Sequence, residues 1–235
     1  MIRKRLLGLA LIALLSPTLC GSTRAQEVKL YPVDEAYKDR SFKLFRGRLK
    51  AALKRRDRKF LLSILDKRIR NSWGGAGGVK EFVDHWNLNS ANSKVWAELL
   101  TILSMGGSFV KENGKTSFYA PYVSSRWDTI EKKLPRDLED FCCGAVIATK
   151  VKMHSQPGSA ATILAILSYD VVKVDYEGSV LKDASQEDFR WVKIKTLKGQ
   201  DGYVRGDQVR SPIGLRASFK KVRGNWVMDN LVGGD

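Results

Sequence analysis

The sequence has 235 residues, a formal net charge of +16 and a hydrophobic content of 43%. This globular composition excludes a disordered chain, a collagen-like chain and a multi-span membrane protein. The length is sufficient for one large domain or two small ones. The basic excess favours anionic polymers or headgroups as partners, although a high charge also serves solubility alone.

The N-terminal stretch has the pattern of a secretory signal peptide over residues 1–25. Arg3, Lys4 and Arg5 precede an apolar run over residues 6–15, which is too short to cross a bilayer as a helix. Small residues follow, and they predict cleavage between Ala25 and Gln26. The alternative is an uncleaved anchor. We therefore expect an exported protein, periplasmic or secreted, with no membrane span in the mature chain, so that envelope polymers precede nucleic acid as expected partners.

Helical periodicity dominates the first half of the chain. Residues 41–54 carry apolar side chains at helical spacing, and shorter helical patterns follow from Asp57 and from residues 79 and 93. A strand-like segment at 67–73 and a glycine run at 74–78 separate them. Asn113-Gly114 predicts a β-hairpin. These patterns predict an α+β N-terminal domain over residues 26–140.

Part of this half resembles the nuclear-transport-factor-like (cystatin-like) superfamily, whose fold is a cone-shaped α+β domain. The resemblance covers residues 41–86, and residues 214–232 resemble the last strand pair of that superfamily. It implies that a hairpin at 212–235 returns to complete the N-terminal domain. The alternative is a barrel that is extended by its own extra hairpin. The matching positions are Phe45, Leu49, Ala52, Leu53, Arg56, Asp57, Phe60, Leu62, residues 74–78, Phe82 and Trp86.

Short strand patterns replace the helical period in the second half. Several of them, separated by turns, predict a small barrel over residues 144–210. Residues 146–209 resemble a bacterial SH3-like (SH3b) domain, through the segments 151–159, 163–167, 171–174, 191–194 and 199–204. His154 and Gln156 depart from that pattern, which usually has Arg and Gly there. The expected fold class is therefore α+β: a helical or α+β N-terminal domain, then a small SH3-like β-barrel and a C-terminal β-hairpin.

Aromatic residues of the predicted barrel are the candidate ligand contacts. In SH3-like domains, aromatic side chains on one face bind extended peptides or glycan-linked peptides. The resemblance thus implies a binding site at Tyr176, Trp191, Tyr203 and Arg205, with peptidoglycan peptides or a protein partner as ligand. The alternatives are that Trp191 belongs to the barrel core and that Arg205 is a solvated charge.

Catalytic and metal sites are not expected. Cys142 and Cys143 are adjacent, too close for an ordinary disulfide, and they enter a strand instead of starting a helix as in cell-wall cysteine peptidases. We expect small apolar core residues there, with a redox-active pair as the alternative. His85 and His154 lack the spacing of metal ligands.

The sequence therefore predicts an exported, non-catalytic binding protein without a cofactor or metal. The alternative function is small-molecule binding, or an isomerase- or dehydratase-type reaction, in a cavity of the N-terminal domain. Asp84 and His85 are the adjacent candidates for acid–base chemistry there.

Overall fold

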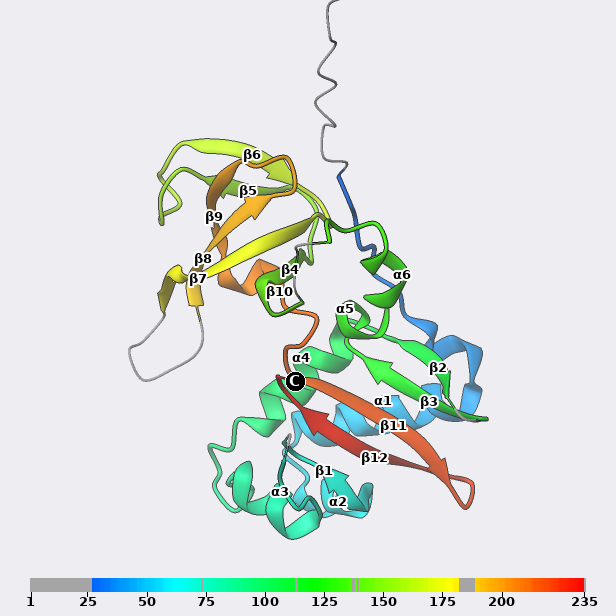
Figure 1. Ribbon diagram of the computed structural model, residues 1–235. Coiled ribbons are helices and arrows are strands. Elements are labelled where there is room, and N and C mark those ends of the chain that lie inside the picture. Colours follow the sequence, from blue (N-terminus) through cyan, green and yellow to red (C-terminus); the bar gives the residue numbers. More distant parts are fainter. Residues whose placement is uncertain are drawn as a thin grey trace, which may run out of the picture.

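The structure is a computed structural model that describes residues 27–72, 74–112, 114–136, 138, 140–181 and 189–234. The predicted signal peptide and its cleavage residues, Ala25 and Gln26, lie outside the described residues. Two β-sheets organise the chain, one with five strands and one with seven. They lie at opposite ends of the molecule, with the short helices α5 (Tyr122–Ser125) and α6 (Asp128–Glu131) near their junction (Figure 1).

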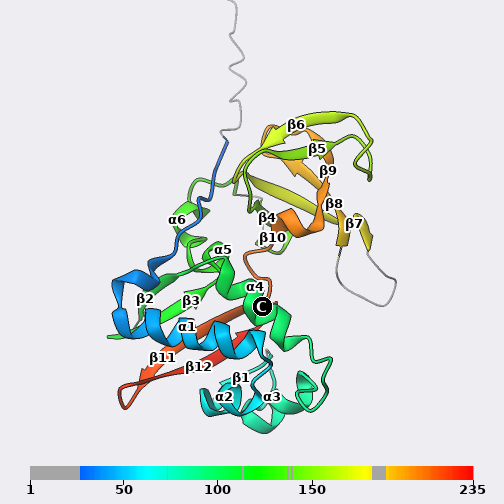
Figure 2. The same ribbon diagram turned by 180° about the vertical axis from the view of Figure 1, so that it is seen from behind.

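The five-stranded sheet combines strands from distant parts of the chain. Its order is β1-β12-β11-β3-β2, and β1 runs parallel to β12 while the other pairs are antiparallel. The last two strands of the chain therefore lie in the middle of this sheet (Figure 2). The strands are β1 (Leu65–Arg70), β2 (Ser108–Glu112), β3 (Lys115–Ala120), β11 (Arg216–Val222) and β12 (Asn225–Val232).

An aromatic core joins this sheet to the longest helix. Phe42 of α1 lies 4.2 Å from Phe118 and 5.8 Å from Phe219, measured between ring centroids, and all three side chains are fully buried. The other elements of this half are η1 (Glu35–Lys38), α1 (Arg40–Lys54), α2 (Arg58–Ser63), α3 (Val79–His85) and α4 (Val95–Ser104). The apolar residues at helical spacing within 41–54 thus form the buried face of α1, as predicted.

Asp39 caps α1 and also links it to the sheet. Its carboxylate accepts hydrogen bonds from the Phe42 amide and from the Lys221 ammonium of β11, at 3.0 and 2.8 Å. The hydrogen bond from Lys221, followed by that from Ser41, holds the pKa of the Asp39 carboxyl well below its usual 3.8. Asp39 therefore stabilises the folded state only while it is ionised.

We expect the stabilisation from Asp39 to be lost in acid. Because its pKa is lowered on folding, this contribution is complete above the unfolded value of about 3.8 and falls as the pH drops through the folded value. The free energy of unfolding, measured in urea, should decrease less from about pH 7 to about pH 3 for Asp39→Asn than for the wild type. Asp39→Ala, which also removes the cap, should cost about 1 kcal/mol more than Asp39→Asn at neutral pH. Equal acid sensitivity of the wild type and Asp39→Asn would contradict this account.

The seven-stranded sheet is antiparallel and curls into a half-barrel. Alternate side chains of its strands, such as Val192, Ile194 and Val204, form an apolar interior. Its order is β10-β4-β7-β8-β9-β5-β6, and within the described residues the outer strands β10 and β6 do not pair with each other. The strands are β4 (Cys143–Val146), β5 (Val151–His154), β6 (Ile163–Leu167), β7 (Val171–Leu181), β8 (Phe189–Thr196), β9 (Asp201–Arg205) and β10 (Val209–Arg210). The 3-10 turns η2 (Asp140–Cys142) and η3 (Gly206–Gln208) flank it.

The expected fold class is wrong. Strands make up 38% and helices 28% of the residues that the structure describes, so this part of the chain is mostly β and shows no clear helical N-terminal domain. The predicted closed barrel is a half-barrel. The hairpin expected at 212–235 forms β11 and β12, which pair with β3 and β1 of the first half and do not extend the half-barrel. The helical periodicity was real, but the helices are short and pack on a sheet whose strands come from both ends of the sequence. Among the described residues no helix is long and apolar enough to span a membrane.

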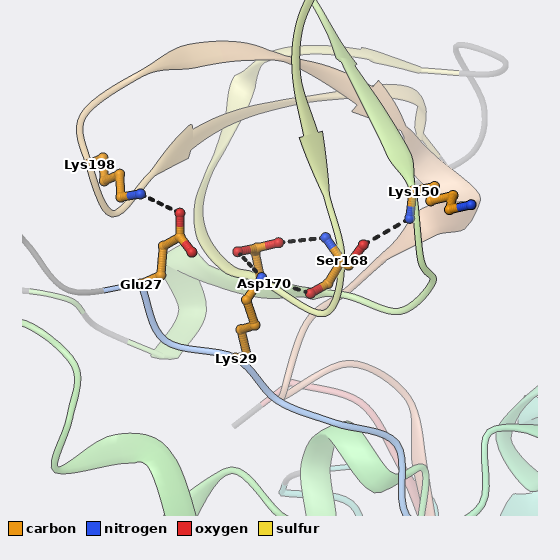
Figure 3. Close-up of polar contacts among 6 residues, drawn as sticks. All are labelled: Glu27, Lys29, Lys150, Ser168, Asp170 and Lys198. Carbon is orange, nitrogen blue, oxygen red and sulfur yellow. Dashed lines mark hydrogen bonds and ion pairs between the residues drawn. The ribbon is translucent and has the colours of Figure 1, made fainter.

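An extended N-terminal segment, residues 27–34, connects the two sheets. Lys29 forms an isolated bridge with Asp170, and Asp34 forms one with Gly107. The Lys29 ammonium lies 2.9 Å from the Asp170 carboxylate, and a second ion pair joins Glu27 to Lys198 (Figure 3). The same Asp170 carboxylate accepts the Ser168 amide at 2.6 Å, so one acidic side chain fixes both the turn before β7 and the N-terminal segment.

Candidate functional site

The outward face of β7, β8 and β9 brings predicted site residues together. Along β8, Val192 and Ile194 belong to the apolar interior, so Trp191 and Lys193 point to the other side of the sheet. Trp191 lies opposite Arg205, and Lys193 lies opposite Tyr203. Directly opposed residues of antiparallel strands share a face. Trp191, Tyr203 and Arg205 therefore lie on one surface.

A shallow groove of about 790 Å³ lies beside this surface and contains the fourth predicted residue, Tyr176. The Tyr176 side chain is 41% exposed, and burial of part of it raises the pKa of its phenol. Lys193 belongs both to the groove and to the surface with Tyr203, so it connects the two. The groove is lined by Phe141, Cys142, Lys173, Val174, Asp175, Tyr176, Glu177, Lys193, Lys195 and Asp201.

The charges of the groove are mixed and balanced, because three lysines face Asp175, Glu177 and Asp201. Lys193 pairs with Asp175 at 2.9 Å, and the hydrogen bond that its ammonium donates to the Asp175 carboxylate raises the pKa of Lys193. Lys195 lies 3.4 Å from Asp201. Among the described residues, Lys173 has no ion-pair partner. The pairs are exposed to water and therefore weak, so a carboxylate ligand can compete for these lysines.

The four predicted residues differ in the exposure of their side chains and in the contacts that hold them. The Trp191 side chain is only 9% exposed, but it is outside the apolar interior and packs edge-on against the His154 ring at 5.5 Å between centroids. Arg205 donates from Nε and Nη2 to the two carboxylate oxygens of Asp207, at 3.0 and 2.6 Å. Tyr203 is half-buried. Of the four predicted residues, Tyr176 therefore offers the most exposed ring.

Sequence reasoning missed the lysines of the site. Lys173, Lys193 and Lys195 all line the groove, together with the exposed ring of Phe141. The alternation Trp-Val-Lys-Ile-Lys in β8 was the available signal, because a period of two places residues 191, 193 and 195 on one face. The contribution of Phe141 had no such signal, since it comes from a 3-10 turn distant in sequence from β8.

The candidate acid–base residues of the first half lie away from the core that the cavity hypothesis requires. Asp84 and His85 are exposed on α3, and Asp84 pairs with Lys80 at 2.6 Å. Cys142 and Cys143 are free thiols, and Cys143 is buried as expected of a core residue. Within the described ranges, no three side chains of His, Cys, Asp or Glu are grouped so that they could hold a metal ion.

Comparison with known proteins gives no match for this chain. No protein-family model matches the chain, and no curated protein or solved structure is similar to it.

Proposed function

We propose that the protein is a non-catalytic binding protein, exported from the cytoplasm, whose outward face of β7, β8 and β9 binds an extended peptide that carries carboxylates. Stem peptides of peptidoglycan have this chemistry, and a protein segment of the same kind is the other ligand of this class. The observation that carries the proposal is the groove that combines the rings of Tyr176 and Phe141 with three lysines.

The chemistry of the groove suits such a ligand. Exposed aromatic rings offer apolar area to aliphatic side chains or sugar rings, and lysines attract carboxylates in a manner that salt weakens. Most residues of its lining belong to the neighbouring strands β7 and β8, so an extended peptide that lies along these strands can contact them. The resemblance of residues 146–209 to SH3-like domains, which bind peptides on an aromatic face, agrees with this reading.

Lys193→Ala is expected to weaken binding to purified peptidoglycan about tenfold, because it removes one charge-assisted contact. Tyr176→Ala should weaken it to a similar degree through the loss of ring contact. Co-sedimentation of the full chain with purified peptidoglycan at low and high salt measures both effects.

Lys43→Ala is the matched control, since Lys43 is an exposed lysine on α1 and its loss changes the net charge equally. The proposal fails if the wild type does not sediment with peptidoglycan at low salt, or if Lys43→Ala weakens binding as much as Lys193→Ala. If the protein instead binds DNA with a steep salt dependence and does not bind peptidoglycan, it is a nucleic-acid binder.

A further inference from the structure

Strand β6 is an edge of the seven-stranded sheet and is unusually apolar for that position. It pairs with β5 on one side and, among the described residues, with no strand on the other. Its sequence, Ile-Leu-Ala-Ile-Leu, contains no charged residue. Ile163, Leu164 and Ile166 are 46%, 39% and 56% exposed. Edge strands are normally short, charged or covered, because free backbone groups invite another strand.

The position of β6 leaves this edge accessible. In both views β6 forms the outer rim of the half-barrel, on the side away from the five-stranded sheet (Figures 1 and 2). In an antiparallel pair, alternate N–H and C=O groups point away from the neighbouring strand. A register shift opposite His154 is confined to the start of β6, and Ala165 to Leu167 pair regularly with β5. These three residues are a template for an added strand.

A hollow continues the apolar edge toward the N-terminal segment. Its volume is about 270 Å³, and Ala165, Ile166 and Leu167 belong to its lining. The lining also contains two ion pairs, Glu27 with Lys198 and Lys29 with Asp170, which are seen in Figure 3. The hollow can accept an aliphatic side chain from a strand that lies along β6, because alternate side chains of such a strand point to this side.

The charges near β6 indicate which kind of strand it can bind. Lys152 lies opposite Ile166 on the neighbouring strand, and both side chains are exposed. Lys150 is exposed just before β5. Among the described residues neither lysine has an ion-pair partner. A second copy paired through β6 would add no acidic side chain near Lys150 and Lys152, and it would join two chains that each carry a net charge of +16. An acidic strand would meet complementary charge instead.

We propose that β6 is a docking edge for an extended acidic segment of another protein, one in which aliphatic and acidic side chains alternate. The segment adds a strand to the sheet through backbone hydrogen bonds to β6. Its aliphatic side chains cover Ile166 and enter the hollow, and its carboxylates pair with Lys150 and Lys152. This edge is separate from the groove of β7 and β8, so the two surfaces can be tested independently.

The test uses fluorescence anisotropy with the full chain and a labelled peptide of about eight residues in which valine and glutamate alternate. We expect this peptide to bind and its valine–lysine counterpart not to bind. Ile166→Glu should weaken binding by about tenfold or more, since it places a like charge on the edge. Val222→Glu is the matched control, because Val222 is an exposed aliphatic residue on a strand of the other sheet. Lys193→Ala tests the separate groove and should leave this binding unchanged.

Protection of the amides of residues 163–167 from hydrogen exchange in the complex should accompany binding. The proposal is overturned if the valine–glutamate peptide does not bind, if Val222→Glu weakens it as much as Ile166→Glu, or if Lys193→Ala abolishes it. It is also overturned if the chain alone forms a dimer that Ile166→Glu dissociates, since the occupant would then be a second copy. Ile166→Glu should leave peptidoglycan binding intact, so failure of one proposal does not imply failure of the other.

Discussion

Truncation of the chain after Ser211 is expected to unfold the five-stranded sheet and its helices. The removed residues include β11 and β12, which separate β1 from β3 in the strand order. They also contribute Phe219, Trp226, Met228 and Leu231 to the main apolar core. Burial of these side chains is worth on the order of 10 kcal/mol, which is comparable with the whole stability of a domain. Far-UV circular dichroism and urea unfolding measure the loss.

The strands of the half-barrel all precede Ser211, and they provide an internal reference for the truncation. The backbone amides of β7, β8 and β9 should still be protected from hydrogen exchange in the truncated chain. Val222→Glu in the full-length chain alters the same hairpin at an exposed position and should change stability by no more than about 0.5 kcal/mol. A truncated chain that keeps its helical signal and a cooperative transition would refute this organisation.

Phe42→Ala is expected to destabilise the protein by about 3–5 kcal/mol, the range for removing a buried phenylalanine. Its ring is fully buried and contacts the rings of Phe118 and Trp226, at 4.2 and 4.8 Å between centroids. The cavity cannot close easily, because the neighbouring rings belong to α1 and to four different strands that hold one another in place. The midpoint of urea unfolding should fall with little change in its slope.

Leu44→Ala is the control for this substitution. Leu44 lies on the same helix, and its side chain is 60% exposed. Alanine there should change the free energy of unfolding by no more than about 0.5 kcal/mol. If both variants lower stability equally, the effect arises from the helix itself and not from the aromatic core.

Local patterns in the sequence predicted elements well. The helix expected over residues 41–54 is confirmed, and so are the hairpins expected around Asn113-Gly114 and Arg223-Gly224. Each of these depends on side-chain periodicity or turn chemistry within a short window. The pairing of Leu65 with Met228 has no such local signal, because any exposed strand edge of suitable pattern could take that place. The return of residues 212–235 to the first half was expected from the resemblance alone and not from any local pattern, whereas the fold class was wrong because the helices are short and strands predominate.

The candidate site, too, was predicted only where a local pattern in the sequence indicated it. The resemblance named Trp191 and Arg205 as site residues, but their pairing across β8 and β9 and the hold of Asp207 on Arg205 appear only in the structure. Phe141 reaches the groove from a turn outside the strands that carry the other residues. The apolar pattern of residues 163–167 correctly gave a strand, yet an edge strand and a central strand read alike in sequence. Only the strand order shows that this one is an edge.

The parallel pairing of β1 with β12 also governs the order in which the chain can fold during its synthesis. β1 is made early, and it acquires its partner only when residues 225–232 have left the ribosome. Until then the apolar face of α1 has no completed sheet to cover, whereas the half-barrel between them can already assemble from contiguous strands. The first half of the polypeptide therefore cannot complete its sheet and core until the last residues of the chain have been made.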